Sequence, residues 1–191
     1  MKIPRYLALL LLLSLPLLGM VGRQLQILDQ GTEVGLETVP VDPRSLFRGD
    51  YVRLSYAISR LDTADLSGDD EFYLHDDIYV LLAPEKDRYA ASAVFRRRPA
   101  VPEGHVVIKG RVSSGVKRRL KDGESKMPPV PSTLSVRYGI ESYFVPEGTG
   151  RELESKASSG EVTVLVAILK SGAAAIKGLR IDGSSHYISP L

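Results

Sequence analysis

The stretch VTVLVAILKSGAAAIKGLRI, residues 162–181, decides the fold class. Its first half is apolar on both faces of an extended chain, because Val164 and Val166 point one way while Leu165 and Ala167 point the other. A strand that is covered on both faces belongs at the centre of a sheet or in a sandwich core. Residues 170–172 (Lys-Ser-Gly) then supply a turn, and residues 173–181 return as a second strand. The stretch therefore predicts a buried β-hairpin.

Short alternating segments of the same kind fill most of the chain on the N-terminal side of this hairpin. They are separated by turn residues, which is the pattern of an all-β domain. Helix is scarce, and residues 149–157 are the best candidate, with Thr149 as the N-cap. We predict a mainly β fold: an antiparallel β-sandwich or barrel-like domain with one short helix. The expected strands, besides the hairpin, are 32–39, 52–58, 78–83, 89–95, 106–112 and 134–140.

Turns and loops are predicted between these strands. Residues 84–87 (Pro-Glu-Lys-Asp) read as the turn of a second hairpin. Residues 62–77 are rich in acids, and residues 117–132 carry a basic run followed by three prolines, so both are expected to be loops. The acidic loop lacks the regular spacing and the glycine of a calcium loop.

The N-terminus has the form of a membrane-directed segment. Lys2 and Arg5 precede residues 6–22, which carry no charge, and Arg23 follows. As a helix this run measures roughly 25 Å, slightly short of a hydrocarbon core of about 30 Å. Basic residues before the run place the N-terminus in the cytoplasm. The sequence therefore divides into residues 1–28, a membrane anchor or signal segment, and residues 29–191, an exported β-rich domain.

Whether the segment is cleaved is left open by the sequence. A signal peptide ends on small residues at the last and third-last positions. Gly22 has Met20 as its third-last residue, and Gly19 has Leu17, so both candidate cleavage positions are poor. An uncleaved single-pass anchor and a cleaved signal peptide both export the domain that follows.

Composition excludes several functions. The chain has 191 residues, 25 Lys+Arg against 23 Asp+Glu, no Cys and 3 His. Without cysteine there is no disulfide, thiolate metal site or thiol nucleophile. A nearly neutral chain is a poor candidate for binding nucleic acid through its phosphates. We predict no metal and no cofactor.

Two segments resemble each other. VRLSYAIS (52–59) and LSVRYGIE (134–141) align Tyr56 with Tyr138 and Ile58 with Ile140. Alternating strands resemble each other by chance, and a duplicated half-domain gives the same resemblance. Strands related by pseudo-two-fold symmetry are the structural mark of the second explanation.

The segment DPRSLFRGDYVRLSY (42–56) carries a resemblance to a known family. Its GDYVRLSY run matches the signature of the GDYXXLXY protein family at Gly49, Asp50, Tyr51, Leu54 and Tyr56. The block RYGIESYFVPEGTGRELE (137–154) is similar to the second half of that family. The resemblance implies a bacterial, membrane-anchored protein, a companion of larger multi-spanning membrane proteins, and it supplies no catalytic residues. It places the chain in the inner membrane with its C-terminal domain in the periplasm.

The candidate binding residues lie beside the two signature blocks, on the outward faces of the expected strands. They are Arg48, Asp50, Tyr51, Arg137 and Glu141. A purely structural role for the signature remains the alternative: Gly49 and Asp50 would shape a turn, while Leu54 and Tyr56 would pack in the core. The basic clusters at 96–98 and 117–119 are either solvated or lean on anionic headgroups.

These observations favour a non-catalytic accessory or binding protein, held on the outer side of the membrane beside a larger integral-membrane partner. The competing hypothesis is a periplasmic hydrolase or peptidase that uses a Ser/Lys arrangement, although G-x-S-x-G is absent from the sequence. An envelope scaffold without a ligand is the third. A polar cleft that joins Ser to Lys would favour the enzyme.

Overall fold

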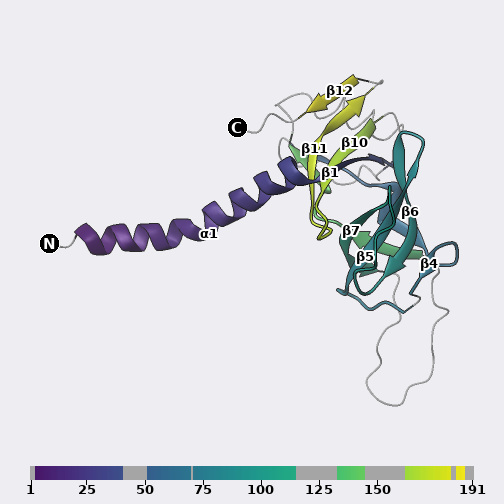
Figure 1. Ribbon diagram of the computed structural model, residues 1–191, viewed down its shortest axis with the longest axis horizontal. Helices are drawn as coiled ribbons and strands as arrows, with labels where there is room; N and C mark the ends of the chain where they lie inside the picture. The colour runs from purple at the N-terminus through teal and green to yellow at the C-terminus, as the bar shows by residue number, and fades with distance from the viewer. Residues whose placement is uncertain are drawn as a thin grey trace, which may run out of the picture.

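A long helix projects from a β-rich domain (Figure 1). The computed structural model describes residues 3–40, 51–69, 71–114, 133–144, 162–181 and 184–187. The loop expected at 117–132, the short helix expected at 149–157, the candidate residue Arg48, and Gly49 and Asp50 of the signature lie outside these residues. The mainly β fold with an N-terminal helix, as predicted, is confirmed.

The helix α1 spans Ile3–Gln30. Leucines along its length are largely exposed, and Leu9–Gln30 is long and apolar enough to cross a membrane; a signal sequence has the same character. Only its C-terminal end contacts the domain, where Ile27 is 5% exposed and packs beside Ala167 and Ala175. The β-domain therefore leaves most of the apolar surface of α1 uncovered.

The first sheet contains β1 (Thr32–Glu37), β10 (Val162–Ile168), β11 (Ala174–Ile181) and β12 (Ser184–Tyr187), in the order β1-β10-β11-β12. All neighbours are antiparallel. Every residue of β10 is buried, as the two-sided apolar pattern predicts. The β10–β11 pair is the hairpin expected at residues 162–181.

The second sheet curls into a half-barrel (Figure 1). Its order is β3-β8-β7-β5-β6-β4. The strands are β3 (Arg60–Asp62), β4 (Ser67–Gly68), β5 (Asp77–Glu85), β6 (Arg88–Phe95), β7 (Val106–Ser114) and β8 (Thr133–Arg137). β2 (Tyr51–Arg53) and β9 (Ser142–Phe144) form a separate, short antiparallel pair.

One core fills the space between the sheets. It takes its side chains from both sheets and from the segments that link them. The largest side chains that are fully buried are Tyr56, Leu36, Ile78, Leu82, Ile108, Leu134, Leu165, Ile168, Val34, Val80 and Val94.

Three local expectations were wrong. The strand expected over 52–58 ends at Arg53, and a 3₁₀ turn, η1 (Ala57–Ser59), follows. The strand expected over 134–140 ends at Arg137, because Gly139 adopts a φ of 80° and turns the chain. The alternating side chains from Leu54 to Ile58 and from Leu134 to Ile140 are still buried, since a tight turn carries them into the same core.

The third error concerns the acidic loop, and the turn of the second hairpin is also shorter than expected. The sheet is not wholly antiparallel, because β4 forms within the loop expected at 62–77 and pairs in parallel with β6. Gly68 makes this pairing possible: its φ is 113°, and a side chain there would collide with the Val94 carbonyl. In the hairpin, Pro84 and Glu85 still belong to β5, and the turn is formed by Lys86 and Asp87.

Candidate functional site

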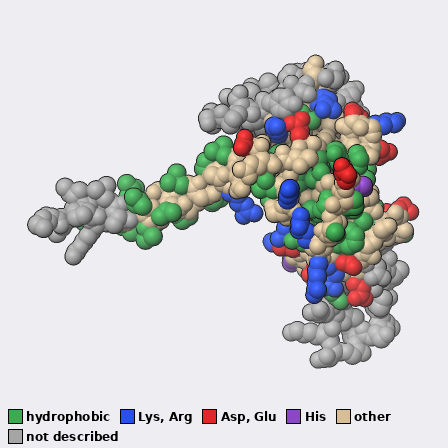
Figure 2. All heavy atoms as spheres, viewed as in Figure 1, with side chains coloured by type: hydrophobic (Ala, Val, Ile, Leu, Met, Phe, Trp, Pro, Cys, Tyr) green, Lys and Arg blue, Asp and Glu red, His purple; other side chains and the backbone are tan. Residues whose placement is uncertain are grey.

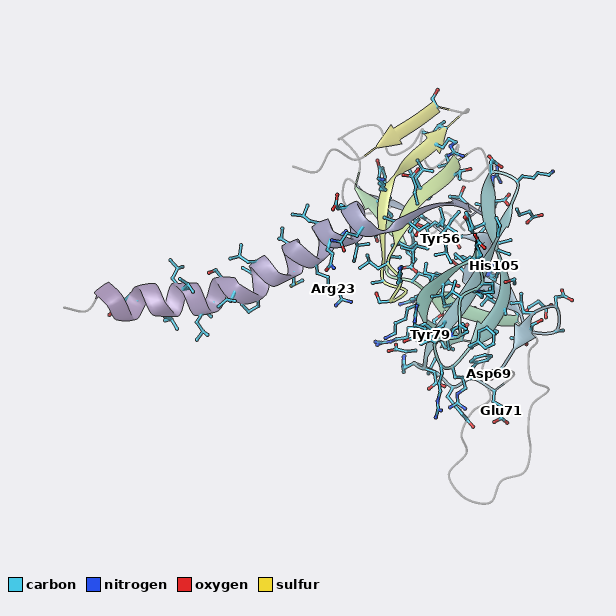
Figure 3. The ribbon with its side chains drawn as sticks, in the orientation of Figure 1. Arg23, Tyr56, Asp69, Glu71, Tyr79 and His105 are labelled. Atoms are coloured by element: carbon cyan, nitrogen blue, oxygen red, sulfur yellow. The ribbon has the colours of Figure 1, made fainter. Side chains whose placement is uncertain are left out.

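The two similar segments cross each other in the core. The Tyr56 hydroxyl donates to the carbonyl of Ile140 at 2.5 Å, and the Tyr138 hydroxyl donates to the carbonyl of Ile58 at 2.6 Å. Each tyrosine therefore bonds the residue that lies two positions beyond the other tyrosine. Their rings are buried, with Tyr56 fully enclosed. Figure 3 labels Tyr56 at the junction of the two sheets.

The local geometry on both sides of the crossing is also reciprocal. The backbone N–H of Tyr56 donates to Ser59 Oγ at 3.2 Å, three residues further along the chain. The N–H of Tyr138 donates to the Glu141 carboxylate at 2.5 Å, again three residues along, and Gly139 donates to the same carboxylate at 3.0 Å. Glu141 thus fixes the turn that brings Tyr138 into the core.

The short strands that flank the two tyrosines also pair reciprocally. Aligning Tyr56 with Tyr138 places β2 on residues 133–135 of β8, and β3 on β9. In the structure β2 pairs with β9 and β3 pairs with β8, with Tyr51 opposite Phe144 and Asp62 opposite Thr133. The two segments are therefore related by a local pseudo-two-fold axis through the crossing.

Burial raises the pKa of Tyr56 and of Tyr138 far above the usual tyrosine value, and the negative charge of Glu141 adds to the effect. Both phenols therefore stay protonated and remain hydrogen-bond donors. A phenol of this kind is a poor base or nucleophile at neutral pH. The crossing is a structural feature, which agrees with the structural interpretation of Leu54 and Tyr56.

A profile described as "GDYXXLXY protein" matches residues 13–179. The chain belongs to the GDYXXLXY protein family. Neither the search of curated proteins nor the search of solved structures found a match. The crossing gives the family's signature a physical meaning, since its Leu and second Tyr are the buried Leu54 and Tyr56.

The predicted binding residues are only partly brought together. The backbone of Tyr51 lies in β2, beside the block that contains Glu141, whose carboxylate serves the turn. Arg137 is exposed on β8, where it lies opposite Arg111 of β7 on the outer face of the half-barrel. Arg48 and Asp50 fall outside the described residues. No single cluster of the predicted residues is formed by the part that the structure describes.

A groove of about 530 Å³ lies beside the crossing, between η1 and the β5–β6 hairpin. Its apolar surface comes from Ile58, Leu61, Leu66, Tyr89 and the alanines at 90 and 91. Sequence reasoning did not find it, because no motif marks its residues and two distant segments form it.

Charged side chains form the walls of the groove. The acids are Glu37, Asp62, Asp65, Glu85 and Asp87, and the bases are Arg60, Lys86 and Arg88. Arg88 is held by Glu37 at 3.0 Å across the mouth. An apolar floor within a charged rim is suited to binding a partly apolar segment.

The acidic loop uses its polar groups within the protein. Asp76 accepts the N–H of Tyr73 at 3.0 Å, and Asp69 accepts the N–H of Arg96 at 2.7 Å (labelled with Glu71 in Figure 3). Lys109 and Arg111 lower the pKa of Asp77 by hydrogen bonding to its carboxylate. Within the described ranges, no three His, Asp or Glu side chains are grouped to hold a metal ion.

The serines with assigned hydroxyl bonds do not form a catalytic dyad. Ser92 donates to the carbonyl of Leu81, and Ser113 donates to the carbonyl of Ser135. The hydroxyls of Ser92 and Ser113 are thus engaged by backbone carbonyls of their own sheet.

Proposed function

We propose that the protein is a membrane-anchored binding protein whose β-domain lies outside the cytoplasm and contacts a larger integral-membrane partner. The observation that carries the proposal is the rigid junction between α1 and the domain. The N–H of Gly31 closes the last turn on the carbonyl of Ile27 at 3.0 Å, and β1 begins at the next residue. A domain joined without a linker is held at the membrane surface.

Retention of the helix is part of the proposal. The residues around both candidate cleavage positions, Gly19 and Gly22, continue the helix, and their third-last residues are large. Ile27 is enclosed by the domain, so the end of α1 belongs to the folded unit. Arg23 at the end of the apolar run can keep its charged group at the interface.

The groove beside the crossing is the proposed contact for the partner. Its apolar floor, with Leu66 and Tyr89, gives a binding segment area to bury, and its charged rim fixes the orientation of that segment. A loop or terminus of a multi-spanning membrane protein has this mixed character. The resemblance of the chain to a family of companions of such proteins supports the same partner class.

Site-specific cross-linking tests this proposal, because the native chain has no cysteine. A photoreactive maleimide on Ala57→Cys, at the groove, is compared with the same reagent on Ala100→Cys, which is exposed and outside the groove lining. The full chain is cross-linked in native membranes and then purified. We expect one multi-spanning membrane protein to be captured from Ala57 only.

A second variant links capture to the groove. Leu66→Glu places a charge on the apolar floor and should abolish capture from Ala57 while the far-UV circular dichroism is unchanged. Equal capture from Ala57 and Ala100, or capture that survives Leu66→Glu, contradicts the groove. Parallel affinity purification with Asp50→Ala and Tyr51→Ala tests whether the signature contributes to partner binding. Full recovery of the membrane partner by both variants would assign the signature to folding alone.

A further inference from the structure

The turn between β10 and β11 lies where the helix meets the domain. Leu169 and Ala173 of this turn pack beside Ile27 and Leu28 at the end of α1. Figure 2 shows lysine and arginine side chains gathered on the side of the β-domain that lies below the helix and faces toward the N-terminal end of the helix. This positive surface begins at the β10–β11 turn.

Three cations surround the turn. Arg98 donates from Nε to the carbonyl of Lys170 at 2.9 Å, and the N–H of Lys109 donates to the carbonyl of Gly172 at 2.9 Å. The residues Arg98, Lys109 and Lys170 are all exposed. The guanidinium of Arg98 and the backbone of Lys109 are thereby fixed against this turn, and Lys170 belongs to the turn itself.

The positive surface continues over the outer face of the half-barrel. Arg111 of β7 lies next to Arg137 of β8 and next to Asp77 of β5 in the strand register. Asp77 contacts Lys109 at 2.7 Å and Arg111 at 3.1 Å, so it offsets part of the charge. We call the resulting surface the basic flank; its cations are Arg98, Lys109, Arg111, Arg137 and Lys170.

The distance along the helix places the basic flank near lipid headgroups. The apolar run ends at Arg23, and Ile27 follows about 6 Å further along the helix axis. Headgroups occupy roughly 5–8 Å beyond the hydrocarbon core on each side. Figure 3 shows Arg23 leaving the helix on the side of the half-barrel. A domain docked on Ile27 therefore begins at the outer edge of the headgroup layer.

We propose that the basic flank binds the anionic headgroups of the bilayer that α1 crosses, and so fixes the tilt of the β-domain. The proposal rests on the proposed function in one respect: α1 must remain as a span. This geometry favours the bilayer as the partner, because the basic flank faces the bilayer that α1 crosses. Each basic residue near an anionic surface contributes about fivefold to such binding.

The test uses the full chain in nanodiscs, with a fluorophore on Ser171→Cys in the β10–β11 turn. Headgroup-labelled nitroxide lipid quenches the fluorophore when the turn approaches the bilayer. Discs of neutral phosphatidylcholine are compared with discs that contain phosphatidylglycerol, at low and high salt. We expect about twofold or greater extra quenching in the anionic discs, and its loss at high salt.

Two matched variants assign the effect to the flank. Lys170→Gln should lower the ratio of docked to undocked domain about fivefold. Lys86→Gln is the control, since Lys86 is also an exposed lysine in a hairpin turn, and the β5–β6 hairpin that carries it lies on the side of the β-domain away from the helix (Figure 1). Equal quenching in both lipids, or equal effects of the two variants, overturns the proposal. The assay contains no protein partner, so its failure is separate from failure of the cross-linking experiment.

A second inference rests on the strand plan of the whole β-domain. In the first half, β5 forms a hairpin with β6 and pairs on its other side with β7. In the second half, β10 forms a hairpin with β11 and pairs on its other side with β1. The first strand of the second half, β7, therefore pairs with the hairpin of the first half, and the first strand of the first half, β1, pairs with the hairpin of the second half. The crossing of Tyr56 and Tyr138 lies between the two halves.

The two hairpins share an irregularity. Their register shifts between Leu81 and Leu82 in β5, and between Leu165 and Val166 in β10. Both shifts leave one extra residue on the return strand, so each is a β-bulge on the second strand of its hairpin. Chance resemblance between alternating strands does not produce matched bulges.

The geometry points to a tandem duplication of a half-domain, with exchange of the first strands. Family sequences split between β6 and β7 and aligned half against half test this inference. We expect the best alignment to place Tyr56 on Tyr138 and Leu81 on Leu165, with a two-residue insertion in the second half between these positions. Alignments shifted by four residues keep the alternation and serve as controls; equal scores for the shifted alignments would overturn the duplication.

Discussion

Removing the two buried hydroxyls at the crossing tests the role of the signature most directly. Tyr56→Phe keeps the ring in the core and removes only the donor to the Ile140 carbonyl. A buried acceptor that loses its partner costs about 1–3 kcal/mol. Tyr138→Phe removes the reciprocal bond to Ile58, also in a buried setting. We expect each change to lower the free energy of unfolding by about 1–2 kcal/mol.

The pseudo-two-fold relation makes the prediction quantitative. The two hydrogen bonds share no atoms and have matching geometry, so the single losses should agree within about 0.5 kcal/mol. Tyr79→Phe is the control: Tyr79 is half-buried on β5, and its loss should stay below about 0.5 kcal/mol.

The assay is urea unfolding of the full chain in detergent micelles, followed by far-UV circular dichroism. Amide exchange at Tyr138 and Gly139 adds a local readout, because both N–H groups depend on the Glu141 cap beside the crossing. A loss below about 0.3 kcal/mol in both single variants, or a loss confined to one tyrosine, would refute the reciprocal crossing as a source of stability.

Three further outcomes follow from the same geometry. Because the folded state keeps the Tyr56 and Tyr138 phenols protonated, stability is full below about pH 10 and falls above it, by about 1.4 kcal/mol per pH unit for each tyrosine; the double Phe variant should lack this slope in pH-dependent urea titrations, and an unchanged slope contradicts the assignment. Gly110→Ala should cost about 1–3 kcal/mol in the same titrations, because its new Cβ would collide with the Val136 side chain and lie 2.9 Å from the Tyr138 ring; no loss would mean that both side chains can move. Gly31→Ala should loosen the helix end, seen as faster proteolysis near residue 31, since its Cβ would meet the Ile168 nitrogen at 2.8 Å; Gly19→Ala has nothing within 4 Å and should behave like the native chain, and equal cleavage of both would argue against a rigid junction.

The candidate site was less predictable than the fold. Outward position on an alternating strand selected Glu141 as a binding residue, whereas its carboxylate caps a turn. Alternation reports which face a side chain occupies, but it does not report that a turn replaces the strand. No sequence motif marks the groove or the basic flank, because residues from distant parts of the chain form each of them.

The sequence by itself determined the apolar helix, the β class, the central strand β10 and the burial of Leu54, Tyr56, Tyr138 and Ile140. These features depend on the period of apolar residues along a short segment, which is a local property. Only the tertiary structure decided which strands pair, that the two tyrosines bond each other's segments, and that a positive surface lies beside the helix end. The physical reason is that strands of similar apolar pattern compete for the same neighbours, and closure of the shared core settles which pairing wins.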